Sequence, residues 1–405
     1  MRIRINKEFS IGRLYFIYLF AVLFLQIIDF SSKGTIIDTV WKASVIILTM
    51  LYTLIKINFK IHKYILLPMM IYILGQLIAI IWPQQFSNNP VISRVVSIII
   101  ILGMCYFFIS IPNILKKYSI DDIICFFNYF IILMIYAVLF NLITNPSSVL
   151  KVFSVSNAYE NMMTSFFDNK QTFGMFLFMG ILISVWQYCI INKQKYILST
   201  FFFIINLFIC LSRTALFSCF SFLLVFGILS LKVAPSISRK LIIGCLVLIF
   251  MIHFIQPIND FVFNVLIKTE DTMNARTNIW NDAFKLLNGS RLLIGYGEGN
   301  VATVLSSINS TGTNSHNGII YVLLTGGIIK LIIYFIINIY SLYNIISIYR
   351  YDKNMCIIEI SVYVGITCFS MGEALVLLDS SAPSIIASIL VIAFPILIRR
   401  IVTSS

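Results

Sequence analysis

Three residues in the second half of this chain have side chains suited to binding an anion and moving a proton. Arg213 follows Ser212 at the start of an apolar tract, Arg276 lies in a long polar stretch, and His316 opens the next apolar tract. Guanidinium groups bind phosphate through paired N–H donors, and a neutral imidazole accepts a proton near pH 7. Together these residues predict a site that holds an anionic group beside a general base.

Both arginines are expected in the first turn of a helix, which is an unfavourable place for a cation. Ser212 is an N-cap residue type directly before Arg213, and Arg276 follows Asn274 at the start of a helix predicted near 275–288. A helix N-terminus carries partial positive charge, so a bound anion would remove the conflict. The alternatives are arginines that reach the lipid headgroups or that pair with the loop carboxylates Glu270, Asp271 and Asp282.

His316 lies at an expected helix start, where the helix dipole favours the neutral imidazole that a general base requires. The alternative is an interfacial histidine that hydrogen-bonds a backbone carbonyl. His62, in a basic connector, and His253, within an apolar tract, are interpreted as structural. Other candidates for a base or a sugar contact are Glu160, Asp168 and Glu373.

Four further polar residues are candidates for the lining of the same cavity, namely Lys42, Arg94, Arg291 and Asn317. For Lys42 and Arg94 the alternative is a side chain that reaches the headgroup region. Lys330 lies deep in a predicted membrane span, and the sequence assigns it no role. The predicted external loops contain no Asp-x-Asp pair, and no Cys/His spacing suits zinc, so neither a metal site nor a cofactor is predicted.

The elements that must position these residues are predicted to be transmembrane helices. Sixty per cent of the residues are hydrophobic and 11% are charged, against about a quarter charged in a soluble domain. The apolar tracts approach the ~20 residues that cross a bilayer, without the alternation of a β-barrel. We therefore expect an all-α integral membrane protein, with residues 1–405 forming one domain. The twelve predicted spans are near residues 14–30, 36–55, 64–82, 92–111, 123–143, 172–191, 196–211, 214–231, 241–256, 317–337, 357–378 and 384–398.

The orientation in the membrane follows from the basic residues. Lys and Arg concentrate in the N-terminal arm, in alternate connectors and at Arg399 and Arg400, so both termini are expected in the cytoplasm. Residues 257–315 then form an extracytoplasmic loop, and the short connector 192–195 makes its two helices antiparallel neighbours. The net charge of +13 is interpreted as this orientation signal, so no nucleic-acid partner is predicted.

The long loop is expected to contain an amphipathic helix near residues 275–288, lying on the membrane or on the helix bundle. Its apolar face would carry Ile279, Trp280, Ala283, Phe284 and Leu287. The glycines of residues 295–299 permit tight turns, and a phosphate-cradling loop is one interpretation of them.

These motifs, in this order, resemble the O-antigen polymerase and O-antigen ligase superfamily of bacterial envelope glycan assembly. The resemblance is carried by residues 211–215 (LSRTA), by Arg276 and Trp280 with 295–297 (GYG) after them, and by 315–317 (SHN) with Gly326 and Gly327. It implies a multi-helix bundle of the polyprenyl-dependent glycosyltransferase type, whose substrate is an oligosaccharide on undecaprenyl pyrophosphate. It also implies that Arg213 and Arg276 hold the pyrophosphate and that His316 is the base, as in the ligase branch.

We therefore expect an extracytoplasmic, inverting and metal-independent polymerase of lipid-linked repeat units, in the bacterial cytoplasmic membrane. Its product would be O-antigen or capsular polysaccharide. Its partners would be the lipid-linked donor and membrane lipids, with a chain-length regulator and a flippase as candidates. A ligase of finished glycan, a flippase or transporter of lipid-linked sugars, and a sensor or scaffold are the alternatives.

Overall fold

The computed structural model describes residues 120–144, 164–167, 169–231, 269–297, 301–308, 314–377, 379, 382–396 and 398–399, with Ser44, Met70, Leu74 and Pro146 as single residues. Within these ranges the regular structure is helical, without strands. Five of their helices are long and apolar enough to cross a membrane, which makes this a multi-pass membrane protein. Apart from single residues, the predicted spans near 14–30, 36–55, 64–82, 92–111 and 241–256 lie outside the described ranges.

The described helices follow the predicted spans closely. Their bounds are α5 Ile120–Thr144, α7 Lys170–Ile191, α8 Gln194–Cys210, α9 Arg213–Ser230, α12 Thr269–Leu286, α13 Ser290–Ile294, α14 Val301–Ser306, α15 Gly318–Ile348, α16 Lys353–Gly372 and α17 Ala382–Ser388, followed by a π-helical turn at Ile389–Ala393. The main difference is α15, which has 31 residues and ends at Ile348, well beyond the predicted end near residue 337. Asn338 and Asn344 donate to the carbonyl oxygens of Tyr334 and Tyr340, one turn back, so these polar side chains fit inside the helix.

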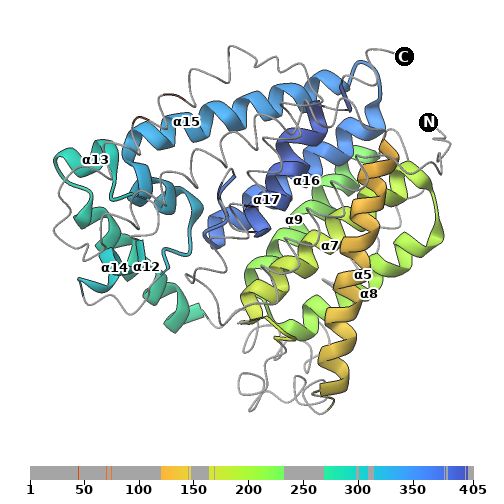
Figure 1. The fold of residues 1–405 in the computed structure, drawn as a ribbon, viewed down its shortest axis with the longest axis horizontal. Coiled ribbons are helices and arrows are strands. Elements are labelled where there is room, and N and C mark those ends of the chain that lie inside the picture. Colours follow the sequence, from red (N-terminus) through yellow and green to blue (C-terminus); the bar gives the residue numbers. More distant parts are fainter. Residues whose placement is uncertain are drawn as a thin grey trace.

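The membrane helices form one bundle around α7 (Figure 1). Helix α8 packs along α7, and α9 lies between α7 and α16. The connector after α7 reverses at Asn192, whose φ is 55°, so the predicted antiparallel neighbours are confirmed. Large apolar side chains on the outside of the bundle, such as Ile143, Leu198 and Ile339, are more than 60% exposed, as expected where lipid is the solvent.

The helices α12, α13 and α14 form a second cluster against the first part of α15, at one end of the molecule (Figure 1). Ile279, Ala283 and Leu287 on α12 are buried there, so this face of the helix packs on protein. Phe284 was expected on the same face, but 55% of it is exposed, because it lies one residue beyond Ala283 and thus about 100° further round the helix.

A break in α15 receives the glycine loop of this cluster. Gly327 has φ 61° and ψ −160°, which interrupts the helix and frees carbonyl groups one turn earlier. The N–H groups of Tyr296 and Gly297 donate to the carbonyl oxygens of Leu324 and Thr325, at 2.7 and 2.9 Å. The interpretation of this loop as a phosphate cradle is therefore wrong for these two N–H groups, because the broken helix already uses them.

The same break explains the position of Lys330. Its Nζ donates to Thr325 Oγ1 at 2.8 Å and lies 5.9 Å from the centre of the Tyr321 ring. A cation is favourable beside the C-terminal end of a helical segment, and the first segment of α15 ends at this point. Lys330 is 7% exposed and belongs to the packing around the break.

Candidate functional site

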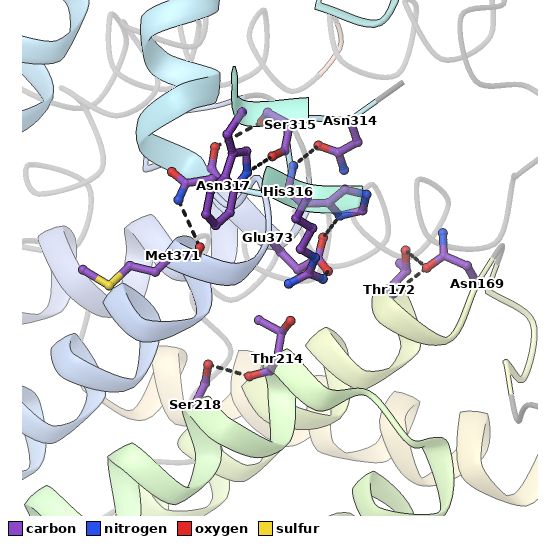
Figure 2. A network of polar contacts seen from close by, with 12 residues as sticks. Asn169, Thr172, Thr214, Ser218, Asn314, Ser315, His316, Asn317, Met371 and Glu373 are labelled. Carbon is purple, nitrogen blue, oxygen red and sulfur yellow. Dashed lines mark hydrogen bonds and ion pairs between the residues drawn. The ribbon is translucent and has the colours of Figure 1, made fainter. Parts of the chain in front are cut away.

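Four helix ends meet at one end of the bundle, namely the starts of α7, α9 and α15 and the end of α16 (Figure 2). A Cβ atom on Gly372, the last residue of α16, would lie 2.5 Å from Thr214 Cγ2 at the start of α9. A Cβ atom on Gly174 of α7 would lie 2.3 Å from Ser212 Cβ. These positions lack side-chain bulk, so the helix ends approach closely and place their polar residues around one point.

Glu373 connects the site, because it binds two of the predicted functional residues. Its Oε1 lies 3.1 Å from a terminal guanidinium nitrogen of Arg276, and its Oε2 lies 2.9 Å from His316 Nδ1. The Glu373 side chain is 10% exposed, while those of Arg276 and His316 are 29% and 28% exposed. The carboxylate is thus covered, and the cation and the imidazole each keep one side open.

The contact with Glu373 decides which nitrogen of His316 can accept a proton. In a neutral imidazole that faces a carboxylate through Nδ1, the proton must lie on Nδ1, because two acceptors cannot bond without it. Nε2 then carries the lone pair that a general base needs. His316 is therefore oriented by the Glu373 carboxylate, and not by the backbone carbonyl considered as the alternative.

The backbone around His316 is held in an uncommon conformation. His316 has φ 46°, in the left-handed region that few residues other than glycine adopt. Its N–H donates to Asn314 Oδ1 at 3.2 Å, and the Ser315 hydroxyl donates to the carbonyl oxygen of Asn317 at 3.1 Å. These local hydrogen bonds turn the chain immediately before α15.

Asn317, predicted to line the cavity, caps α15 and ties it to α16. Its Oδ1 accepts from the N–H groups of Ile319 and Ile320, at 2.9 and 3.2 Å. Its Nδ2 donates to the carbonyl oxygen of Met371 at 3.1 Å, two residues before Glu373 (Figure 2). Asn317 thus fixes the distance between His316 and Glu373.

Helix α12 reaches the site through two side chains one turn apart. Arg276 binds Glu373, and the indole N–H of Trp280 donates to the carbonyl oxygen of Ser315 at 2.9 Å. Residues four positions apart lie on the same helix face, so one face of α12 contacts both Glu373 and the His316 turn.

The expected position of Arg276 in a first helical turn is wrong. Helix α12 begins at Thr269, so Arg276 lies about two turns inside it, where the helix N-terminus no longer opposes a cation. Its described carboxylate partner is Glu373, and Asp282 pairs with Lys285 at 3.0 Å. The loop helix starts earlier than its apolar pattern because residues 269–274 are polar apart from Met273.

Arg213 is the first residue of α9, as expected, and Ser212 precedes it as the N-cap. However, the Ser212 side chain makes no capping hydrogen bond. Arg213 lies within electrostatic range of Lys170, the first residue of α7. Thr214, the next residue, packs on Gly372 beside Glu373, which brings the start of α9 to the Arg276–His316 cluster.

The remaining candidates lie elsewhere or outside the described residues. Arg291 belongs to α13, where it donates to the carbonyl oxygen of Gly295 at 3.2 Å and lies 5.0 Å from the centre of the Tyr296 ring. Burial raises the pKa of that tyrosine, and Arg291 lowers it in part. The positions outside the described residues are Lys42, Arg94, Glu160 and Asp168.

Sequence reasoning gave Glu373 little weight and did not name Lys170, which interacts electrostatically with Arg213. Both lie at the predicted outer ends of spans, which is the signal that could have found them. Charged residues are common at the membrane interface whether or not they are functional, so position in the sequence alone did not single these two out. The residues that they contact in the folded protein do.

Part of the sequence that forms this site matches a known protein family. Residues 198–335 match the family described as O-Antigen ligase. This confirms the resemblance to the O-antigen polymerase and ligase superfamily, while no curated protein matches the chain at a significant level. The matched residues include Arg213, Arg276 and His316, whereas Lys170 and Glu373 lie on either side of the match.

Proposed function

We propose that this protein is a polysaccharide polymerase that joins oligosaccharide repeat units carried on undecaprenyl pyrophosphate, as for O-antigen or capsular polysaccharide. The observation that carries the proposal is the position of Glu373, which holds an imidazole on one oxygen and a guanidinium on the other. A proton acceptor and an anion-binding cation thus lie at one point, at the end of a membrane helix bundle.

The proposed reaction uses these groups on opposite faces of the reacting sugar. An acceptor hydroxyl forms a new bond to the anomeric carbon of the donor, and its proton passes to His316 Nε2. The bond from the anomeric carbon to the phosphate oxygen breaks, and its electron pair leaves with the lipid pyrophosphate. Attack opposite the leaving group inverts the anomeric centre.

Arg213 and Arg276 would stabilise the departing pyrophosphate, because paired N–H donors match phosphate oxygens and are positioned before the reaction. These cations supply the charge stabilisation that the leaving group needs, so the proposed reaction is metal-independent. Glu373 would keep the His316 ring in the productive tautomer and stabilise the imidazolium that forms, as carboxylates do in catalytic triads.

The orientation is also part of the proposal. The ends of α7, α9, α15 and α16 that form the site are the ends expected outside the bacterial cytoplasmic membrane, with both termini in the cytoplasm. Ser306, exposed in α14, offers a test. A cysteine there should react with an impermeant thiol reagent in intact cells, whereas one at Lys193 should not. Labelling of only the Lys193 position would reverse the orientation.

A ligase that transfers finished glycan to another acceptor is the second candidate, because the matched family is described as O-Antigen ligase. Purified protein in liposomes with lipid-linked repeat units would separate the two. A polymerase should build a ladder of products and release undecaprenyl pyrophosphate. A ligase should make no ladder and should transfer glycan only when a different acceptor is added. Movement of the substrate across the bilayer without a new glycosidic bond would indicate a flippase.

A further inference from the structure

The peptide unit that joins Ser315 to His316 is hydrogen-bonded at both ends. Its carbonyl oxygen, on Ser315, accepts from the indole N–H of Trp280 at 2.9 Å. Its N–H group, on His316, donates to Asn314 Oδ1 at 3.2 Å (Figure 2). The carbonyl and N–H groups of a trans peptide point in opposite directions, so this planar unit is held from two sides.

These two hydrogen bonds hold a conformation that the chain does not favour by itself. His316 has φ 46°, and a residue other than glycine stays in this region only where the surrounding structure holds it. The angle φ also sets the direction of the Cα–Cβ bond relative to the peptide unit before it. Holding that unit therefore determines where the imidazole ring lies when its Nδ1 meets Glu373 Oε2.

The two hydrogen bonds have different origins. Asn314 lies within the same turn, whereas Trp280 lies on α12, 35 residues away in the chain. Ile279 and Ala283, on either side of Trp280 along α12, are buried in the loop cluster, so the packing of this helix fixes the indole. Ser315 is buried, and a buried acceptor that loses its donor is unfavourable. The turn before α15 therefore depends on α12.

We propose that Trp280 is a positioning residue for His316, and that its indole N–H holds the peptide before the imidazole so that Nε2 faces the acceptor hydroxyl. Trp280 acts through the backbone of the turn, so its loss should slow the chemical step and leave donor binding unchanged. This inference rests on the proposed role of His316 as the base, and it adds that the loop helix α12 keeps this base in place.

The first test measures the kinetics of the full-length protein in liposomes, with lipid-linked repeat units purified from a strain that lacks this protein. Trp280→Phe keeps an aromatic ring but removes the N–H donor. It should lower kcat roughly 2- to 10-fold, the effect of one hydrogen bond, with KM unchanged. The matched control is Tyr296→Phe, which removes a 2.9 Å hydrogen bond to the Leu286 carbonyl oxygen in the same cluster and should keep the wild-type kcat.

A second variant pair separates positioning from general stability. In protein that already carries His316→Ala, adding Trp280→Phe should leave the residual rate unchanged, because no imidazole remains to be positioned. A further loss by the same factor would overturn the proposal, since Trp280 would then act without His316. A raised KM with unchanged kcat in Trp280→Phe would also overturn it, because the indole would then bind substrate.

The third measurement needs no turnover. The chain has three histidines, so in protein labelled with ¹⁵N-histidine the His316 ring signals are those missing from His316→Ala. Trp280→Phe should move these signals away from the Nδ1–H tautomer, whereas Tyr296→Phe should not. Unchanged His316 signals in folded Trp280→Phe would refute the positioning role. A wild-type protein that shows the expected signals but makes no glycosidic bond would contradict the proposed function alone.

Discussion

His316 Nδ1 lies 2.9 Å from Glu373 Oε2, although 57 residues separate the two in the chain. The contact is possible because Asn317 ties the start of α15 to Met371 near the end of α16. It orients the imidazole so that Nε2 is the nitrogen left to accept a proton. The same carboxylate also binds Arg276, so the proposed base and the proposed anion-binding residue are both held by Glu373.

Replacing His316 with Ala should reduce glycan transfer by roughly 10²–10⁴-fold, because a positioned general base contributes about that much. Pyrophosphate binding should persist, since the proposed anion contacts come from other residues. The measurement is the transfer rate of purified protein with lipid-linked repeat units. Wild-type rates in the Ala variant would move the base elsewhere, with Glu160 and Asp168 as the next candidates.

Replacing Glu373 with Gln keeps the shape of the side chain but removes its charge. Hydrogen bonds to charged groups contribute about 1.5–3 kcal/mol, so a roughly 10- to 100-fold loss of transfer rate is expected. Asp282→Asn is the control, because it breaks the exposed ion pair with Lys285 and should leave the rate near that of the wild type. Equal rates in the two variants would show that the carboxylate does not support His316.

Replacing Arg213 or Arg276 with Lys should remove most of the activity, since an ammonium group cannot reproduce the paired donors of a guanidinium. The loss should appear in glycan synthesis at low donor concentration and in weakened pyrophosphate binding. Full synthesis by both variants would show that the paired donors are not needed. Arg291→Lys is a useful comparison, because that arginine lies in α13 against Gly295 and Tyr296.

Replacing Gly327 with Ala should destabilise the loop cluster, because the new Cβ would lie 2.3 Å from the carbonyl group of Leu293 at a φ of 61°. Gly289→Ala is the matched control, since its φ is 51° but no atom lies within 4 Å of the new Cβ. Both glycines combine a positive φ with a ψ of −160° or −131°, a backbone conformation that is strained for other residues and costs about 1–3 kcal/mol. The melting temperature should therefore fall further in Gly327→Ala than in Gly289→Ala. Equal decreases would mean that the loop packed against Gly327 moves aside without an energetic cost.

The sequence predicted those parts of the structure that local rules control. Long apolar tracts became α7, α9 and α16, because a backbone in lipid must bond within its own helix. The helix start at Arg213 and the short turn between α7 and α8 were also predicted. For these elements the deciding interactions lie within a few residues, so the local sequence contains them.

Tertiary structure alone decided which residues meet. Glu373 resembles any interfacial carboxylate until α15 and α16 are tied at Asn317 and Met371. The glycines of residues 295–299 suggested a phosphate-cradling loop. The N–H groups of Tyr296 and Gly297 instead bond to carbonyl groups that are available only because α15 breaks at Gly327. Each of these contacts joins segments far apart in the chain, and its partner depends on how the helices pack, which the periodicity of a single tract does not contain.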